Sequence, residues 1–376
     1  MKIGKLQFKN YAAEKPVSIS AKGEFITPRE VAHNSSLALG SLLALSTDLK
    51  LKLATARYEA EPDFKLAIVG IGILTKKEVI EHLKAQTNFG QLALQAEIQY
   101  CNELMSSLVA PKLPSWPTIP KPPVGKWPDW KPVKKCIMLK LRNRALFCEN
   151  TTDQVTSPFA AYRIANVHPV FANRGFTLIV LKGTDDIRVN FVPQAKNTLT
   201  VYLSGIGHGN YTVYTGHGGN YILMASQYDP SEVKDKAIHF LSCETAAQLG
   251  PDTVAKGAKC YIGYTENFVL QWDDPSTPAT NEFLLFAKSD STVGIMMANG
   301  STAQQAYDAT IQAFNAAISQ VPNTVAATYL TWDRDHLKLC GDPATQIVPY
   351  RYVKVCFPLA AIEQEDALLK SGVLVR

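Results

Sequence analysis

The chain lacks several features that would assign it to a common class. Seven of its 376 residues are cysteine, and none of these forms a CxxC pair. This spacing argues against a zinc site and against a disulfide framework, so we expect no metal and a reducing compartment. No apolar run approaches the roughly 20 residues that a membrane-spanning helix needs.

We also expect neither a leader nor a nucleic-acid footprint. The first residues, Met1 to Lys5, contain no long apolar stretch of the kind that marks a secretory signal. The net charge is only +5, and lysine and arginine do not gather into a basic block. We therefore expect a cytoplasmic protein that binds neither membranes nor nucleic acid directly.

A proline-rich segment is the clearest boundary in the chain. Between 111 and 132, prolines first recur at every third residue, which matches one turn of polyproline II. We expect a linker over 111–132 that separates an N-terminal region, 1–110, from a second domain, 133–376. Three of the five tryptophans fall in or beside this linker, which favours packing against the second domain, with a PxxP ligand for a partner as the alternative.

The N-terminal region is predicted to be mostly helical. Helix starts are indicated at 27–30, where Pro28 follows Thr27, and at 75–78, where Thr75 and Glu78 form a capping box. A longer helix is expected over 90–108. Nothing in this region indicates a particular chemistry, so we expect it to regulate the second domain or to dock a partner.

After the linker, strands and helices alternate. This pattern predicts a mainly parallel sheet that is covered by helices on both faces, and the ligands of such sheets bind at the carboxyl ends of the strands. The expected order is a strand at 137–147, a helix at 158–173, a strand at 176–181, a helix at 185–195, a strand at 198–204, a hairpin at 211–224, a strand at 237–241, a helix from about 245 and a strand at 258–264.

Two of these strands end in reactive side chains. The segment 203–209 ends in His208 and Gly209, and the segment 238–245 contains Cys243. If the two strands are neighbours, their carboxyl ends bring an imidazole beside a thiol, which is the pair that a cysteine nucleophile requires. The other reading of Cys243 is that it is an ordinary buried cysteine.

In this order, the motifs resemble the caspase-like clan of cysteine peptidases, which includes caspases, legumains, gingipains, separases and bacterial CHAT proteins. The greatest similarity is to CHAT. The cysteine motif of that family usually reads Leu-Ser-Ala-Cys-Glu-Thr, and 241–245 of this chain reads Leu-Ser-Cys-Glu-Thr, without the alanine. The resemblance covers roughly 134–350. Further similar segments are 257–263, 272–274, 300–306 and the Gly-Asp-Pro at 341–343.

The resemblance implies a caspase-like three-layer α/β sandwich and a cysteine endopeptidase. Cys243 would form a thioester with the substrate, His208 would act as base and acid, and no cofactor would be needed. The backbone amides of Gly209 and Cys243 would form the oxyanion hole. CHAT proteins often serve in bacterial defence or cell death, which implies a protein substrate and an activating partner.

Some assignments stay open at this stage. His217, in a second Gly-His-Gly, is the alternative base, although it falls in the predicted hairpin turn; His239 is expected to be a core residue or a pocket wall. Acidic residues in the loops that shape the specificity pocket of this clan favour a basic side chain before the cleaved bond. These candidate substrate-binding residues are Glu149, Asp153, Asp273 and Asp274.

Two rival functions remain. The chain could be a catalytically silent scaffold with the same fold, in which case a peptidyl electrophile would not label Cys243. It could also use the same nucleophile for another acceptor, as a transpeptidase or a deamidase does, and the mass of the product would then distinguish ligation from hydrolysis.

Overall fold

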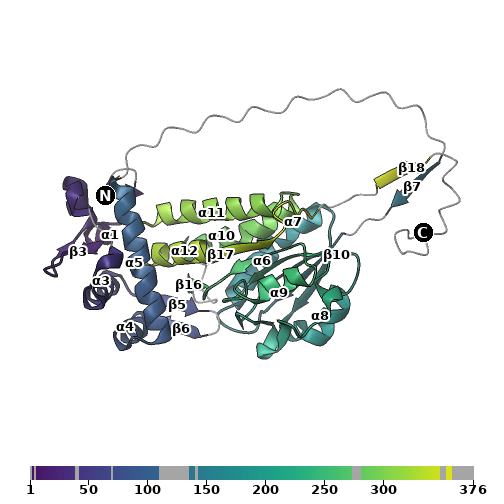
Figure 1. Cartoon of the computed structure of the whole chain (residues 1–376), viewed down its shortest axis with the longest axis horizontal. Coiled ribbons are helices and arrows are strands. Elements are labelled where there is room, and N and C mark those ends of the chain that lie inside the picture. The colour runs from purple at the N-terminus through teal and green to yellow at the C-terminus, as the bar shows by residue number, and fades with distance from the viewer. Residues whose placement is uncertain are drawn as a thin grey trace, which may run out of the picture.

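The structure is a computed structural model, and it describes residues 2–3, 6–38, 42–68, 71–109, 135–139, 143–272, 281–347 and 353–357. A central α/β unit lies beside an N-terminal unit that is rich in helices (Figure 1). Between the two units lies a small sheet, to which each unit contributes short strands.

The central sheet has six strands, and five of them are parallel. Its spatial order is β17-β15-β14-β10-β8-β9, and only β17 at one edge runs antiparallel to its neighbour. This order places the switch between the first and third strands of the unit at β8 and β10, where ligands of such sheets commonly bind. The strands are β8 Arg144–Glu149, β9 Thr177–Lys182, β10 Thr200–Ile206, β14 Ala237–Leu241, β15 Cys260–Tyr264 and β17 Leu337–Gly341.

Alternating side chains of the sheet enter two hydrophobic clusters. Along β14, Ala237 and Leu241 belong to the larger cluster, whereas Ile238 and Phe240 belong to the smaller one on the opposite face. The larger cluster is covered by α6 Ser157–Asn166, α7 His168–Asn173, α10 Asn281–Ala298 and α11 Ala303–Gln320; the other face carries α8 Arg188–Ala195 and α9 Leu249–Ala255. The predicted three-layer α/β sandwich with a mainly parallel sheet is confirmed.

The N-terminal region is mostly helical, as predicted, and both predicted helix starts are confirmed. Thr27 and Thr75 each form a full capping box, with Glu30 and Glu78. Its helices are α1 Asn10–Glu14, α2 Pro28–His33, α3 Thr47–Ala60, α4 Lys76–Ala85 and α5 Asn88–Val109, with the 3-10 turns η1 Ser35–Ala38 and η2 Leu42–Ala44. Two small hairpins, β1 Lys2–Ile3 with β2 Leu6–Gln7 and β3 Ser18–Ile19 with β4 Phe25–Ile26, complete it.

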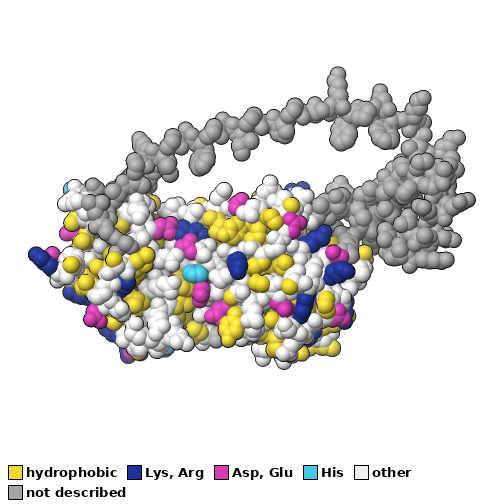
Figure 2. Space-filling view, in the orientation of Figure 1, with side chains coloured by type: hydrophobic (Ala, Val, Ile, Leu, Met, Phe, Trp, Pro, Cys, Tyr) yellow, Lys and Arg dark blue, Asp and Glu magenta, His cyan; other side chains and the backbone are white. Residues whose placement is uncertain are grey.

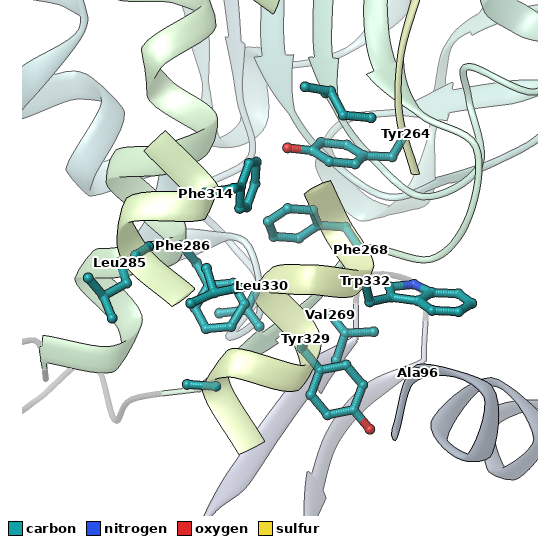
Figure 3. Packing of buried hydrophobic residues seen from close by; sticks show 14 of the residues in the cluster. Ala96, Tyr264, Phe268, Val269, Leu285, Phe286, Phe314, Tyr329, Leu330 and Trp332 are labelled. Atoms are coloured by element: carbon teal, nitrogen blue, oxygen red, sulfur yellow. The ribbon is translucent and has the colours of Figure 1, made fainter. Parts of the chain in front are cut away.

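The two halves of the chain share one core. Helix α5 packs against α12 Val325–His336, and the larger hydrophobic cluster contains residues from both halves. Figure 3 shows Ala96 of α5 on one side of this core, with Phe268 between Tyr264 and the helix that carries Leu330 and Trp332. The N-terminal region is therefore an integral part of the packed structure. The predicted linker lies outside the described residues.

A small antiparallel sheet also joins the halves. Its order is β16-β5-β6, with β5 Lys65–Ile68 in the middle, β6 Gly72–Thr75 on one side and β16 Val269–Gln271 on the other. Strand β16 follows β15 of the central unit, whereas β5 and β6 come from the N-terminal region (Figure 1). Both pairings are antiparallel.

Several predicted boundaries were wrong. The strand expected at 137–147 is two strands, because β7 Lys135–Leu139 pairs with β18 Val353–Phe357 and only β8 enters the central sheet. The helix expected at 158–173 divides into α6 and α7, because Pro169 has no amide hydrogen to continue the ladder. Helix α9 begins at Leu249, after a turn that Glu244 enters with a positive φ of 59°.

The predicted hairpin is a three-stranded unit that leads away from β10. It consists of β11 Gly209–Asn210, β12 Val213–Thr215 and β13 Tyr221–Met224, with η4 His217–Gly219 in the turn. Two further 3-10 turns are η3 Gly183–Asp185 and η5 Pro230–Glu232. On the face shown in Figure 2, lysine and arginine side chains lie scattered among acidic and apolar ones.

Candidate active site

The strands that carry the two proposed reactive residues are direct neighbours. Strands β10 and β14 are parallel, with Ile206 opposite Leu241, and the amide of Gly207 extends the contact by donating to the Leu241 carbonyl at 3.3 Å. Beyond the strands, a Cβ atom at Gly209 would lie 2.3 Å from the Ser242 Oγ. The segments 207–209 and 241–243 are therefore in direct contact, as the sequence predicted.

The side chain of Cys243 lies in the same hydrophobic cluster as the end of β14. Leu241 and Cys243 both belong to the larger hydrophobic cluster, on the face of the sheet that helix α10 covers. Ile206, which is opposite Leu241, belongs to the same cluster. His208 and Cys243 each lie two residues beyond these partners, past the ends of β10 and β14.

His208 lines a pocket of about 750 Å³ at this edge of the sheet. Its Nε2 lies 3.3 Å from Oδ2 of Asp153, which follows β8, the strand on the other side of β10. Gly209 lines the same pocket, as the proposed oxyanion role requires. Ile71, Gly72 and Ile73 from the N-terminal region also line this pocket.

Asp153 is held in place by the loop in which it lies. Its Oδ1 accepts hydrogen bonds from the amides of Val155 and Thr156, and its Oδ2 accepts one from the Asn150 side chain at 2.8 Å. Burial alone would raise the pKa of this carboxyl, but hydrogen bonds from His208 and Thr156 lower it to about 2. Asp153 is therefore an ionised partner of the imidazole.

This role of Asp153 was missed in the sequence. The residue was assigned to substrate binding because it is an acid in a specificity loop, but His208 and the backbone of its own loop already engage both of its oxygens. A short Asn-x-x-Asp turn immediately after the first strand of a parallel sheet was the available signal, since such turns pin a carboxylate at the strand end.

Cys243 is buried. Only 1% of the residue is exposed, and its Sγ accepts a hydrogen bond from the amide of Phe268 at 3.3 Å. Burial raises the pKa of the thiol well above its ordinary value, and the hydrogen bond from Phe268 only partly opposes this effect. Among the described residues that line the pocket beside His208, Cys243 does not occur.

His217 lies in η4, at the turn between β12 and β13, where the sequence predicted it. Its Nδ1 lies 3.0 Å from the hydroxyl of Thr152, and its amide donates to the carbonyl of Asp186. The loop that holds Asp153 against His208 thus also contacts His217. The choice of His208 over His217 as the base stays a prediction.

The assignment of Glu149 to substrate binding was wrong. The residue is fully buried, and its carboxylate accepts hydrogen bonds from Arg163 at 3.1 Å and lies 2.9 Å from Nε2 of His168. A carboxylate that is neutralised inside the core cannot reach a substrate side chain. Asp273 and Asp274 lie outside the described residues.

His239 is a core residue, as expected. It is buried on β14, its Nδ1 lies 3.1 Å from the carbonyl of Ile262, and its Nε2 lies 3.4 Å from Asp290. Within the described residues, no three His, Cys, Asp or Glu side chains are grouped so that they could hold a metal ion. The described helices are each too short or too polar to cross a membrane.

Comparison with known proteins gives only a distant likeness. No protein-family model and no curated protein sequence matches the chain. Two similar solved structures are of gingipain R, described as an Arg-specific cysteine proteinase, one of them in a complex of the Porphyromonas gingivalis RgpB pro- and mature domains. Their TM-scores are 0.36 and 0.37, at 11% identity, over 55% of this chain and 48% of each gingipain chain.

The chain thus matches about half the length of these gingipain structures. Gingipains are among the families that the sequence motifs resemble, and the similarity to CHAT stays a prediction. At these TM-scores the likeness assigns neither an activity nor a set of site residues.

Proposed function

We propose that the chain is a cysteine endopeptidase that uses Cys243 as nucleophile and His208 as general base and acid, and that the described conformation is a latent one. The observation that carries this proposal is the contact between the ends of β10 and β14, where Gly207 donates to the Leu241 carbonyl and Gly209 packs against Ser242. The imidazole of His208 and the thiol of Cys243 belong to the segments that follow these two adjacent strands.

The reaction would begin with transfer of the thiol proton to the imidazole. Asp153 engages Nε2 of His208, so exchange with the thiol would use Nδ1, and the ionised carboxylate would favour the imidazolium that forms. The thiolate would attack the scissile carbonyl, and the amine would leave with the proton from His208. Water would then hydrolyse the thioester and restore the thiol and the imidazole.

The oxyanion hole is proposed at the backbone amides of Gly209 and Cys243. Gly209 lines the pocket next to His208, and its lack of a Cβ matters because Ser242 and the Val213 carbonyl lie within 2.5 Å of where one would be. Backbone donors in a rigid turn can stabilise a developing negative charge without reorganising.

Hydrolysis needs a thiol that the substrate can reach. In the latent state the Cys243 thiol is buried, so the substrate cannot reach it. A buried thiol with a raised pKa has little thiolate at neutral pH, so it is a poor nucleophile. A change that exposes Cys243 to the pocket would therefore switch the activity on. A protein substrate and an activating partner fit this scheme, and a role in bacterial defence is the proposal that the resemblance to CHAT supports.

The test is hydrolysis of a mixed peptide library by the full chain. Wild-type protein should cleave peptides, at a rate that mild destabilisation increases, whereas Cys243→Ala and His208→Ala should each abolish the cleavage. Cys148→Ala and His239→Ala are controls for loss of a buried thiol and a buried imidazole. Equal cleavage by wild type and by Cys243→Ala would refute the proposal.

The second candidate is a catalytically silent scaffold. It is favoured by one observation, the enclosure of Cys243 in the hydrophobic cluster together with Leu241. This candidate expects that no denaturant concentration, temperature or added protein produces cleavage that depends on Cys243.

A further inference from the structure

The residue that bonds the Cys243 thiol, Phe268, immediately precedes β16. Phe268 donates its amide to the thiol and is itself fully buried, with its ring against Tyr264 at 4.8 Å and against Phe159 at 6.0 Å between centroids. The next residue, Val269, opens β16 and donates its amide to Asp333 at 3.1 Å. Strand β16 is therefore directly continuous with the residue that bonds the buried thiol.

Strand β16 is paired with the N-terminal region along its whole length. Val269, Leu270 and Gln271 lie opposite Ile68, Ala67 and Leu66 of β5. The ladder continues to Trp272, which donates its amide to the Lys65 carbonyl at 3.1 Å and has the Lys65 ammonium 5.1 Å from the centre of its ring. The indole of Trp272 donates to the Gln154 carbonyl, next to Asp153.

The same hairpin forms a wall of the pocket. Residues Ile71, Gly72 and Ile73, at the turn between β5 and β6, line the pocket together with His208 and Gly209. Ile71 is 50% exposed, so this apolar side chain is held at the opening without being part of the core. One N-terminal element thus both pairs with the strand that follows Phe268 and lines the pocket that contains the imidazole.

We infer that the β5–β6 hairpin is a built-in inhibitory clamp, which keeps the site latent by pairing with β16 and is released when that pairing opens. Strand β5 is paired with β16 in the way that an extended peptide binds to the edge of a sheet, through main-chain hydrogen bonds. Release would free this edge and the thiol together. The inference depends on the proposed function only for its consequence in catalysis, since accessibility of Cys243 is measurable by itself.

A disulfide staple tests the clamp. Trp272 and Lys65 form a hydrogen-bonded pair, so the alternation of an antiparallel ladder makes Leu66 and Gln271 a non-hydrogen-bonded pair, whose Cα atoms are expected about 4.5 Å apart. That spacing is within the range for a disulfide. The variant is Leu66→Cys with Gln271→Cys, and the matched control is Ile19→Cys with Phe25→Cys in the β3–β4 hairpin.

The readout is the rate at which iodoacetamide alkylates Cys243, followed by peptide mass. If the open form is a minor state of a few per cent, the oxidised staple should slow this rate by roughly tenfold or more compared with the same variant after reduction. The control staple should leave the rate unchanged. Equal rates in the oxidised and reduced forms of Leu66→Cys/Gln271→Cys would overturn the inference.

A second variant works in the opposite direction. By the same alternation, the amide of Ala67 is directed toward β16, so Ala67→Pro removes a bond of this pairing. It should accelerate alkylation of Cys243 while the circular dichroism of the rest of the chain stays native; unchanged alkylation in a folded Ala67→Pro would also contradict the clamp. If the variants change the alkylation rate of Cys243 as expected but no peptide is hydrolysed, this inference stands and only the proposed peptidase activity is refuted.

Discussion

The amide of Phe268 donates a hydrogen bond to the sulfur of Cys243 at 3.3 Å, and both residues are buried. These residues are 25 positions apart and follow neighbouring strands, β14 and β15. The contact gives the buried thiol a hydrogen-bond donor, and Cys243 is not among the described residues that line the pocket beside His208.

Phe268→Ala should weaken this cover and destabilise the protein. Removing a fully buried phenylalanine leaves a cavity, which typically costs about 3 to 5 kcal/mol. Urea unfolding should report this loss, and alkylation of Cys243 under native conditions should accelerate. Val189→Ala, at a side chain that is 71% exposed, is the control and should change neither quantity. Slow alkylation in a folded Phe268→Ala protein would show that the cover lies elsewhere.

Asp153→Asn should lower kcat more than it changes KM, because the residue orients the imidazole. A decrease of roughly 100-fold is expected, which is the lower end of what general acid–base catalysis contributes. The amide can still accept the bonds from Val155 and Thr156, so the loop should stay folded. A change confined to KM would instead return Asp153 to the substrate-binding role that the sequence suggested.

The same substitution should change the stability of the protein in acid. The pKa of Asp153 falls from 3.8 to about 2 on folding, so the unfolded state binds more protons in this interval. The resulting stabilisation is complete above pH 4 and is lost as the pH falls toward 2. Unfolding curves of wild type and Asp153→Asn should therefore converge over this range; parallel curves would contradict the assigned ion pair.

Asp186 should affect the pH dependence of stability in the opposite direction to Asp153. Burial raises its pKa from 3.8 to about 7, so the folded state holds a proton that the unfolded state has released. Stability should therefore decrease as the pH rises from about 4 to 7 and then level off. Asp186→Asn should flatten this dependence, and the exposed neighbour Asp185→Asn should not. An unchanged slope in Asp186→Asn would mean that the carboxyl titrates normally.

Glu149→Gln separates a core role from a role in specificity. Removing the charge leaves Arg163 buried without its counter-ion, which typically costs about 3 to 5 kcal/mol. The preference for the residue before the cleaved bond should stay as in wild type, because Glu149 does not reach the pocket. A shifted preference at unchanged stability would restore the original assignment.

The sequence was informative where local pattern decides structure. The apolar runs before His208 and Cys243 predicted neighbouring parallel strands, and the capping boxes at Thr27 and Thr75 predicted two helix starts. The sequence did not predict contacts between segments that are far apart along the chain. Nothing near Cys243 indicates that Phe268 will bond its sulfur, or that residues 65–68 will pair with the strand that follows.

The two acids after β8 show the same limit. Glu149 and Asp153 look alike as loop carboxylates, but Glu149 ends β8 and is buried against Arg163, whereas Asp153 lies in the following loop, where backbone amides hold it beside His208. Only the partners distinguish them, and those partners lie 14 and more than 50 residues away.

The most direct test is labelling of the full chain with a peptidyl acyloxymethyl ketone, with the modified residue located by peptide mass mapping. The account predicts a single adduct on Cys243 that forms slowly in the native protein, forms faster in Ala67→Pro and is absent in His208→Ala. The buried cysteines Cys101, Cys148 and Cys260 should stay unmodified. No adduct on Cys243 in Ala67→Pro, or an adduct rate that does not depend on His208, would contradict it.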